Sequence, residues 1–309
     1  MSSTSYLSFM VLIFLMNLCF AVALPLLKQA IGYAPPLLVV SARMILGGLL
    51  VGMLGKISGE CVVPMRQWNW KLLVSTACVA MYMVCVGEAI ALEYMSATRA
   101  SLIWALLPCI TATIGWIGYG QSLRRKQVCS IFLGTIGMIV LVMGSAPLGD
   151  LFTISCSSVD ALMLGAVIAA GWAYFLISRV IEEGYGILQS NALIMLLGGV
   201  MSFVTWLVFY DFTAAASILW WPFIGYSAMV AVIVNVIGLS LQNFLIVRYP
   251  IAFLALSSCI TPMTSSVIGV YVLGEAWRAE YTIAATCIML GLLLFYYEEL
   301  QKLYKGVYA

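Results

Sequence analysis

Two charged side chains lie inside long apolar stretches of the sequence, and they are the first candidates for chemistry. Arg43 lies in LLVVSARMILGGLLVGML, and Glu88 lies in LLVSTACVAMYMVCVGEAIAL. A charge inside a membrane-spanning helix is costly, so it is normally paired or faces a polar cavity. A guanidinium binds a carboxylate, and a carboxylate binds a cationic group, so the two residues together suit a zwitterionic ligand. A permanent ion pair is the structural alternative, and Glu88 equally suits the binding and release of a proton.

Deep amides and aromatic rings form a second group of candidates. Asn17 and Asn235 lie in the middle of apolar runs, where hydrogen bonding between helices explains an amide about as often as ligand binding does. Trp104, Trp172 and Tyr174 lie too deep for the aromatic belts at the membrane surfaces. Flat aromatic walls suit a ring or a cation, and packing in the core is the alternative. All five residues are included in the candidate substrate site.

The composition excludes a soluble globular protein. Of the 309 residues, 64% are hydrophobic and only 8% are charged, which leaves too little polar surface. The net charge of +2 comes from scattered residues and does not indicate a nucleic-acid partner. The nine cysteines lie mostly in apolar runs without any CxxC, and histidine is absent, which argues against a disulfide framework and against a zinc or haem site. We therefore expect an integral membrane protein without a metal or cofactor.

Apolar runs of about 20 residues predict ten membrane-spanning helices, so the expected fold is all-α. The runs are 7–26, 36–54, 71–92, 97–119, 128–145, 159–178, 190–210, 221–243, 250–273 and 281–297. The first run lacks a basic flank and a small-residue cleavage site, so we expect a retained helix and not a signal peptide. The connecting segments are short, which places the function among the helices.

Basic residues in the loops predict the orientation. With the N terminus in the cytoplasm, ten lysines and arginines fall in cytoplasmic segments, and Lys28, Arg99 and Arg278 fall on the opposite side. Both termini are therefore expected in the cytoplasm, with the chain in the plasma (bacterial inner) membrane. At 1.5 Å per residue, Arg43 lies roughly 12 Å below the outer end of its run, and Glu88 about 24 Å from the cytoplasmic end of its own. Both fall in the outer half, whereas Arg99 at the outer turn is expected to be solvated at the interface.

The sequence contains an internal repeat. An offset of 154 positions places Pro108 on Pro262. A proline inside a helix frees a backbone carbonyl and bends the helix, so the matched prolines predict paired breaks at a central site or a hinge. A second and weaker match places Gly47-Gly48 on Gly198-Gly199, and these glycines indicate close helix packing.

The repeat divides the chain into two halves, 1–150 and 151–309, with five expected spans in each. Because five is an odd number, the second half enters the membrane from the opposite side, and the halves form an inverted-topology repeat. Proteins of this design generally hold their substrate near the midplane, between the halves.

Three segments carry a resemblance to a known family. They are SARMILGGLL at 41–50, SATRASLIWALLPCITATIGW at 96–116 and IAFLALSSCITPMTSSVIGVYVLGE at 251–275. The sequence resembles the ten-helix EamA-type transporters of the drug/metabolite transporter superfamily over nearly its whole length. The resemblance implies a carrier of small metabolites, such as amino acids, purines or nucleotide sugars. The first repeat has Gly120-Gln121 where the second has Gly274-Glu275, so the glutamate usual at this place in the family is expected to be structural.

We therefore predict a secondary-active transporter that works by alternating access. The sequence contains no ATP-binding motif, so coupling to protons or to a counter-solute is expected. Arg43, Glu88 and the deep rings favour an amino acid or an amino-acid derivative, and S-adenosylmethionine is one such solute known in the superfamily. The alternatives are export of a nucleobase, a nucleoside, a toxic cation or another drug or metabolite. A membrane-embedded enzyme fits less well, because histidine and paired carboxylates within the spans are missing. A non-transporting scaffold or channel subunit fits less well, because the matched prolines and the charges within the spans indicate a moving core that is lined by solute.

Overall fold

The described part of the chain is all-helical, as the sequence predicts. The computed structural model describes residues 3–60, 63–120, 125–143, 157–209, 218–248, 260–277 and 279–295. Every regular element in these ranges is a helix. Seven helical stretches are long and apolar enough to cross a membrane: Val11–Ile31, Pro36–Ile57, Trp70–Tyr94, Ala97–Gly118, Ser158–Glu182, Ile187–Phe209 and Trp220–Gln242.

Six of the expected spans are single helices in the described ranges. They are α3 (Pro36–Ile57), α8 (Arg125–Met143), α9 (Ser158–Glu182), α10 (Ile187–Phe209), α14 (Ile260–Leu273) and α15 (Ala279–Phe295). Of these, α8, α14 and α15 are not among the seven long apolar stretches. The expected start of the ninth span, 250–259, lies outside the described residues.

The other four expected spans are built from consecutive helices. These are α1 (Ser3–Ala21) with α2 (Ala23–Ile31), α4 (Trp70–Ala77) with η2 (Cys78–Met83) and α5 (Val84–Tyr94), α6 (Ala97–Trp104) with α7 (Leu107–Tyr119), and α11 (Trp220–Val230) with η4 (Ala231–Gly238) and α12 (Leu239–Arg248). A short 3-10 helix, η1 (Met65–Gln67), lies in the turn before α4.

Prolines explain two of these interruptions. A proline has no N–H to donate to the carbonyl four residues earlier. Pro25 would otherwise bond to Ala21, the last residue of α1, and Pro108 to Trp104, the last residue of α6. The break predicted at Pro108 is therefore present. Pro262 lies in the first turn of α14, directly after residues that are not described.

The other two interruptions are π-helical segments, which the apolar runs of the sequence do not predict. The repeat offset of 154 places η2 inside η4, so the two segments occupy matching places in the halves. Each meets a glycine across a helix interface. A Cβ on Gly198 would lie 2.4 Å from Cβ of Met81 in η2, and a Cβ on Gly47 would lie 2.9 Å from Cβ of Asn235 in η4. Single π turns within α-helices are frequent at functional sites.

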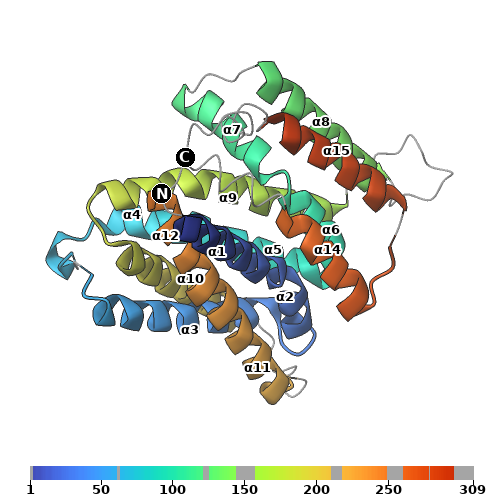
Figure 1. Ribbon diagram of the computed structural model, residues 1–309. Coiled ribbons are helices and arrows are strands. Elements are labelled where there is room, and N and C mark those ends of the chain that lie inside the picture. Colours follow the sequence, from blue (N-terminus) through green and yellow to red (C-terminus); the bar gives the residue numbers. More distant parts are fainter. Residues whose placement is uncertain are drawn as a thin grey trace.

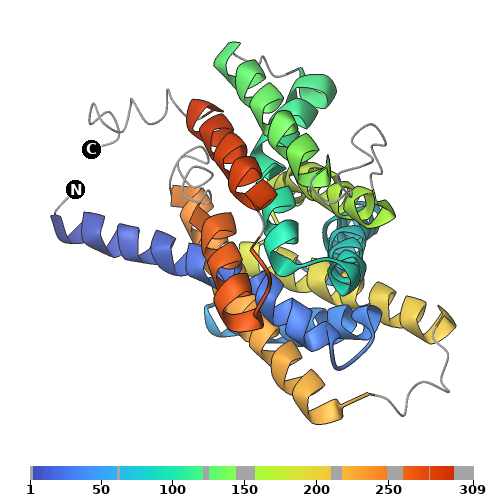
Figure 2. The same cartoon turned by 90° about the vertical axis from the view of Figure 1, so that its right-hand side faces the viewer.

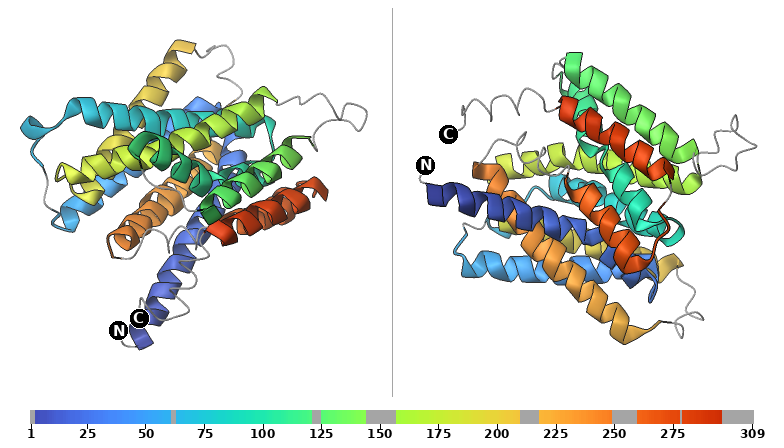
Figure 3. Two further views of the ribbon diagram at one scale, coloured as in Figure 1. Left: turned by 90° about the horizontal axis from the view of Figure 1, so that it is seen from above. Right: turned by 45° about the vertical axis from the view of Figure 1, so that its right-hand side comes forward.

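Helices from the two halves pack in pairs. The pair α8 and α15 lies side by side at one edge of the bundle (Figures 1 and 2). The pair α3 and α10 lies on the far side of the bundle from them (Figure 3). A Cβ on Gly48 would meet the carbonyl oxygen of Ala192 at 3.1 Å, and a Cβ on Gly199 would meet the backbone nitrogen of Ile45 at the same distance. The Gly-Gly pairs therefore serve close helix packing, as predicted.

Charged side chains connect the ends of helices on both sides of the bundle. Glu275, just after α14, accepts hydrogen bonds from the N–H groups of Ala97 at 2.6 Å and Thr98 at 2.9 Å, at the N-terminus of α6. The Thr98 hydroxyl adds a third at 2.7 Å. At the opposite ends of the helices, Glu60 accepts bonds from the N–H groups of Leu188 and Gln189 at the N-terminus of α10. Carboxylates are favoured at helix N-termini, and these contacts support the structural role expected for Glu275.

Candidate functional site

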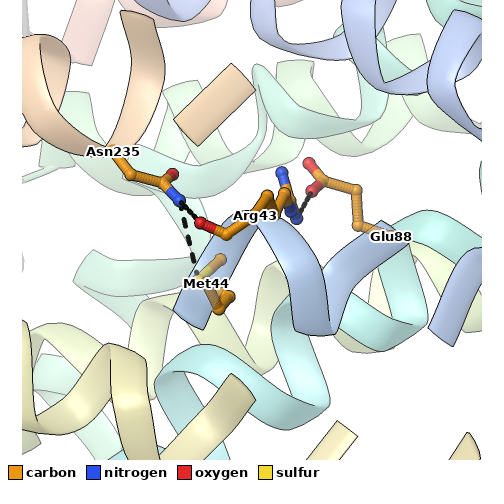
Figure 4. A network of polar contacts seen from close by, with 4 residues as sticks. All are labelled: Arg43, Met44, Glu88 and Asn235. Atoms are coloured by element: carbon orange, nitrogen blue, oxygen red, sulfur yellow. Dashed lines mark hydrogen bonds and ion pairs between the residues drawn. The ribbon is translucent and has the colours of Figure 1, made fainter. Parts of the chain in front are cut away.

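Arg43 and Glu88 meet in the structure. Arg43 is the eighth residue of α3, whose start is set by Pro36, and its side chain is 4% exposed. Glu88 lies on α5, just beyond the π-helical segment η2, and its side chain is 13% exposed. One guanidinium nitrogen, Nη2, lies 3.2 Å from Oε2 of Glu88 (Figure 4). The pairing that helix depth suggested is therefore present.

The pair is incompletely satisfied. Nε of Arg43 is buried and has no hydrogen-bond partner. The indole ring of Trp104, at the end of α6, lies beside the Glu88 carboxylate, yet its buried Nε1 also has no partner within hydrogen-bonding distance and angle. Leaving a buried donor unpaired costs roughly 1–3 kcal/mol. This cost applies to both donors beside the Glu88 carboxylate.

A second buried arginine pair shows what complete pairing looks like. Arg99 on α6 binds Asp160 on α9 through two bonds, Nε to Oδ1 at 2.8 Å and Nη2 to Oδ2 at 2.7 Å. The expectation that Arg99 is merely solvated at the interface is wrong. Asp160 is only 2% exposed and lies in the first turn of α9, three residues after the N-cap Ser157. The sequence did not indicate it as the partner of Arg99.

Asn235 supports Arg43 from the other side. Its side-chain amide donates to the carbonyl oxygen of Arg43 at 3.1 Å and lies 3.8 Å from the sulfur of Met44 (Figure 4). Asn235 is buried in η4, and Gly47 provides the space for it. The contact joins α3 in the first half to the π-helical segment in the second. Asn235 thus holds the backbone from which the Arg43 guanidinium extends.

The remaining amide, Asn17, joins two other helices. Its Oδ1 accepts a hydrogen bond from the Thr261 hydroxyl at 2.9 Å, and its Nδ2 donates to the carbonyl of Ile13. The first contact connects α1 to α14. It is the kind of bond between helices that the sequence left open as the alternative to ligand binding.

Trp172 and Tyr174 lie on α9 and are 45% and 40% exposed. Residues two apart on an α-helix point about 200° away from each other, so the two rings cannot face one cavity. The Tyr174 hydroxyl lies beside the side-chain amide of Gln242 on α12. Within the described residues, neither ring makes a hydrogen bond to Arg43 or Glu88. Of the predicted rings, Trp104 is the one that the structure brings to the pair.

Comparison with known proteins supports the resemblance noted in the sequence. Residues 7–143, somewhat less than half of the chain, match the EamA-like transporter family. The first half of the chain is therefore similar to that family.

Two relatives extend the similarity to almost the full chain. The S-adenosylmethionine/S-adenosylhomocysteine transporter of Chlamydia muridarum is 23% identical, over 95% of this chain and 93% of its own length. The transporter of the same name from Chlamydia trachomatis serovar L2 is 22% identical, over 95% of this chain and 90% of its own length. A crystal structure of another protein superposes with a TM-score of 0.61, over 92% of this chain and 94% of the other chain. The two sequences are 16% identical, so the match shows a shared fold alone.

One residue of the candidate site was not predicted from the sequence. Cys85 lies one turn before Glu88 on α5, is buried, and has both Arg43 and Glu88 as charged neighbours. Its spacing of three residues from Glu88 places it on the same helix face, and that periodicity was the available signal. The candidate site thus consists of Arg43, Cys85, Glu88 and Trp104, with Asn235 behind Arg43.

Proposed function

We propose that this EamA-like transporter carries an amino acid or an amino-acid derivative by alternating access, with Arg43 and Glu88 at the solute site. The observation that carries the proposal is the incomplete pairing of Arg43, which contrasts with the two-bond pairing of Arg99. A purely structural ion pair gains by satisfying all of its donors. The Arg43 pair instead keeps an unused donor, and a solute would supply the acceptor.

The relatives favour a particular class of solute. They are named transporters of S-adenosylmethionine and S-adenosylhomocysteine, and they cover nearly this whole chain. Both solutes carry an amino-acid head group, and S-adenosylmethionine carries an additional positive charge at sulfur. Arg43 would bind the carboxylate and Glu88 the cationic group once the two side chains separate. S-adenosylmethionine is therefore the leading candidate.

Alternating access in this proposal rests on two inverted halves, 1–150 and 151–309, with ten spans in all. The matched contacts of the π-helical segments support it. Gly47 of the first half packs against η4 of the second half, and Gly198 of the second half packs against η2 of the first half. The packing of α3 with α10 and of α8 with α15 also joins corresponding spans. The halves would rock about a central site, with Pro108 and Pro262 at the hinges. Trp172, Tyr174 and Asn17 remain proposed contributors to the solute path.

Flux into proteoliposomes tests the function. We expect saturable uptake of S-adenosylmethionine by the wild-type protein, driven by a counter-solute or a proton gradient. Glu88→Gln should abolish net uptake of this cationic solute, while Glu182→Gln, an exposed carboxylate at the end of α9, should leave it unchanged.

The form of the Glu88→Gln defect separates two roles. Loss of both net uptake and solute exchange indicates that Glu88 binds the cationic group. Loss of net proton-driven uptake with exchange retained indicates that Glu88 couples transport to protons. Normal transport by the variant would remove Glu88 from the site.

A further inference from the structure

Two buried donors beside the Glu88 carboxylate make no hydrogen bond of good distance and angle. They are Nε of Arg43, on α3, and Nε1 of Trp104, on α6. Arg43 as a whole is only 3% exposed, so water does not reach its guanidinium from the surface. The donors come from different helices of the first half, and α5, which carries Glu88, contacts both helices.

Both groups can only donate. A guanidinium has five N–H donors and no acceptor, and an indole has one donor and no acceptor. Neither can therefore be satisfied by a cation or by another donor. A carboxylate has two oxygens that together accept about four hydrogen bonds, so a single carboxylate can satisfy both donors.

We infer that Arg43 Nε and Trp104 Nε1 form the subsite for the solute carboxylate, and that Trp104 selects solutes that carry one. The inference rests on the proposed transport function and gives Trp104 a role in the proposed site. Glu88 touches the guanidinium through Nη2 alone, at 3.2 Å, which leaves Nε available to the incoming carboxylate. Once the carboxylate binds, Glu88 turns to the cationic group of the same solute. Asn235 holds the Arg43 backbone in place during this exchange of partners.

Trp104→Phe tests the subsite, because it keeps an aromatic ring and removes only the N–H and the smaller ring. The solutes are S-adenosylmethionine and its decarboxylated analogue, which differ by the carboxylate alone. In proteoliposomes, Trp104→Phe should lower kcat/KM for S-adenosylmethionine roughly tenfold or more, as expected for one lost hydrogen bond to a charged group. Uptake or competition by the decarboxylated analogue should not change.

Two further variants provide a second test and a control. Arg43→Lys keeps the positive charge and removes Nε, so it should also lower discrimination between the two solutes. Trp116→Phe, an exposed tryptophan on α7, is the control and should leave both solutes unchanged. Equal losses for the two solutes in Trp104→Phe would show that Trp104 only packs, and would overturn the inference. Unchanged kinetics for both would overturn it as well.

Equilibrium binding to the purified protein in detergent separates this inference from the function itself. If no flux is found but S-adenosylmethionine binds more tightly than its decarboxylated analogue, and Trp104→Phe removes the difference, the proposed transport fails and the subsite stands. If the wild-type protein binds both solutes equally, or binds neither, the subsite is overturned whatever the flux.

Discussion

At the scale of residues, two arginines differ in how completely their side chains are paired. Both Arg43 and Arg99 are largely buried and face a carboxylate on another helix. Arg99 makes two short bonds to Asp160, whereas Arg43 makes one longer bond to Glu88 and keeps Nε unpaired. The completeness of pairing, and not burial or charge, distinguishes the two arginines, and it is the basis of the solute site proposed at Arg43.

Replacing Arg99 with alanine leaves the carboxylate of Asp160 buried without its partner. Breaking a buried ion pair costs about 3–5 kcal/mol, so we expect a marked fall in the thermal unfolding temperature of the detergent-solubilised protein. The double variant Arg99→Ala with Asp160→Ala should recover part of the loss, because no buried charge then remains. Unfolding of Arg99→Ala at the wild-type temperature would contradict a structural role for the pair.

At the scale of elements, the ends of helices are fixed by side chains from distant parts of the chain. Glu275, after α14, closes the N-terminus of α6 with three hydrogen bonds. Lys28, on α2, donates to carbonyl oxygens at the end of α5, including that of Met95 at 2.9 Å, and also contacts that of Leu92. Basic side chains suit helix C-termini as carboxylates suit N-termini. The turn between α5 and α6 is thus held from both directions.

Removing the carboxylate from Glu275 should destabilise the N-terminus of α6. We expect Glu275→Ala to cost roughly 1.5–3 kcal/mol, the range for hydrogen bonds to a charged group, as a lower thermal unfolding temperature. Glu275→Gln keeps an acceptor oxygen and should lose less. Gly269→Ala should act in the same direction, because its Cβ would lie 2.6 Å from the Thr98 hydroxyl oxygen and 2.8 Å from Oε2 of Glu275. Equal stability of Glu275→Ala and wild type would refute the cap.

For the whole molecule, the decisive question is how the halves are oriented. The distribution of lysine and arginine predicts both termini in the cytoplasm, and the inverted repeat requires an even total of spans. A reporter that fluoresces only in the cytoplasm should therefore be bright when fused after Ala309. Inserted within 144–156, it should be dark, and within 183–186 it should be bright. A dark C-terminal fusion would exclude ten spans with the N terminus inside.

Much of the fold and part of the site could be predicted from the sequence. Long apolar runs dictate helices because a bilayer leaves no other way to satisfy the backbone, and Pro108 dictates a break because it lacks an N–H. Depth along the helices placed Arg43 and Glu88 in the same half of the membrane, and the structure pairs them. Local chemistry and periodicity were sufficient for each of these predictions.

The tertiary structure alone decided which partners those residues meet. Asp160 for Arg99, the α6 N-terminus for Glu275 and the Arg43 backbone for Asn235 are contacts between segments far apart in the chain. Such contacts depend on how helices cross and rotate about their axes, which apolar runs do not specify because every face of a membrane helix is apolar. The two π-helical segments likewise pack closely against Gly47 and Gly198 in the opposite half, a contact that the apolar runs do not indicate. The sequence by itself determined a membrane-embedded helical protein with charges at depth, and the tertiary packing decided which of those charges are fully paired.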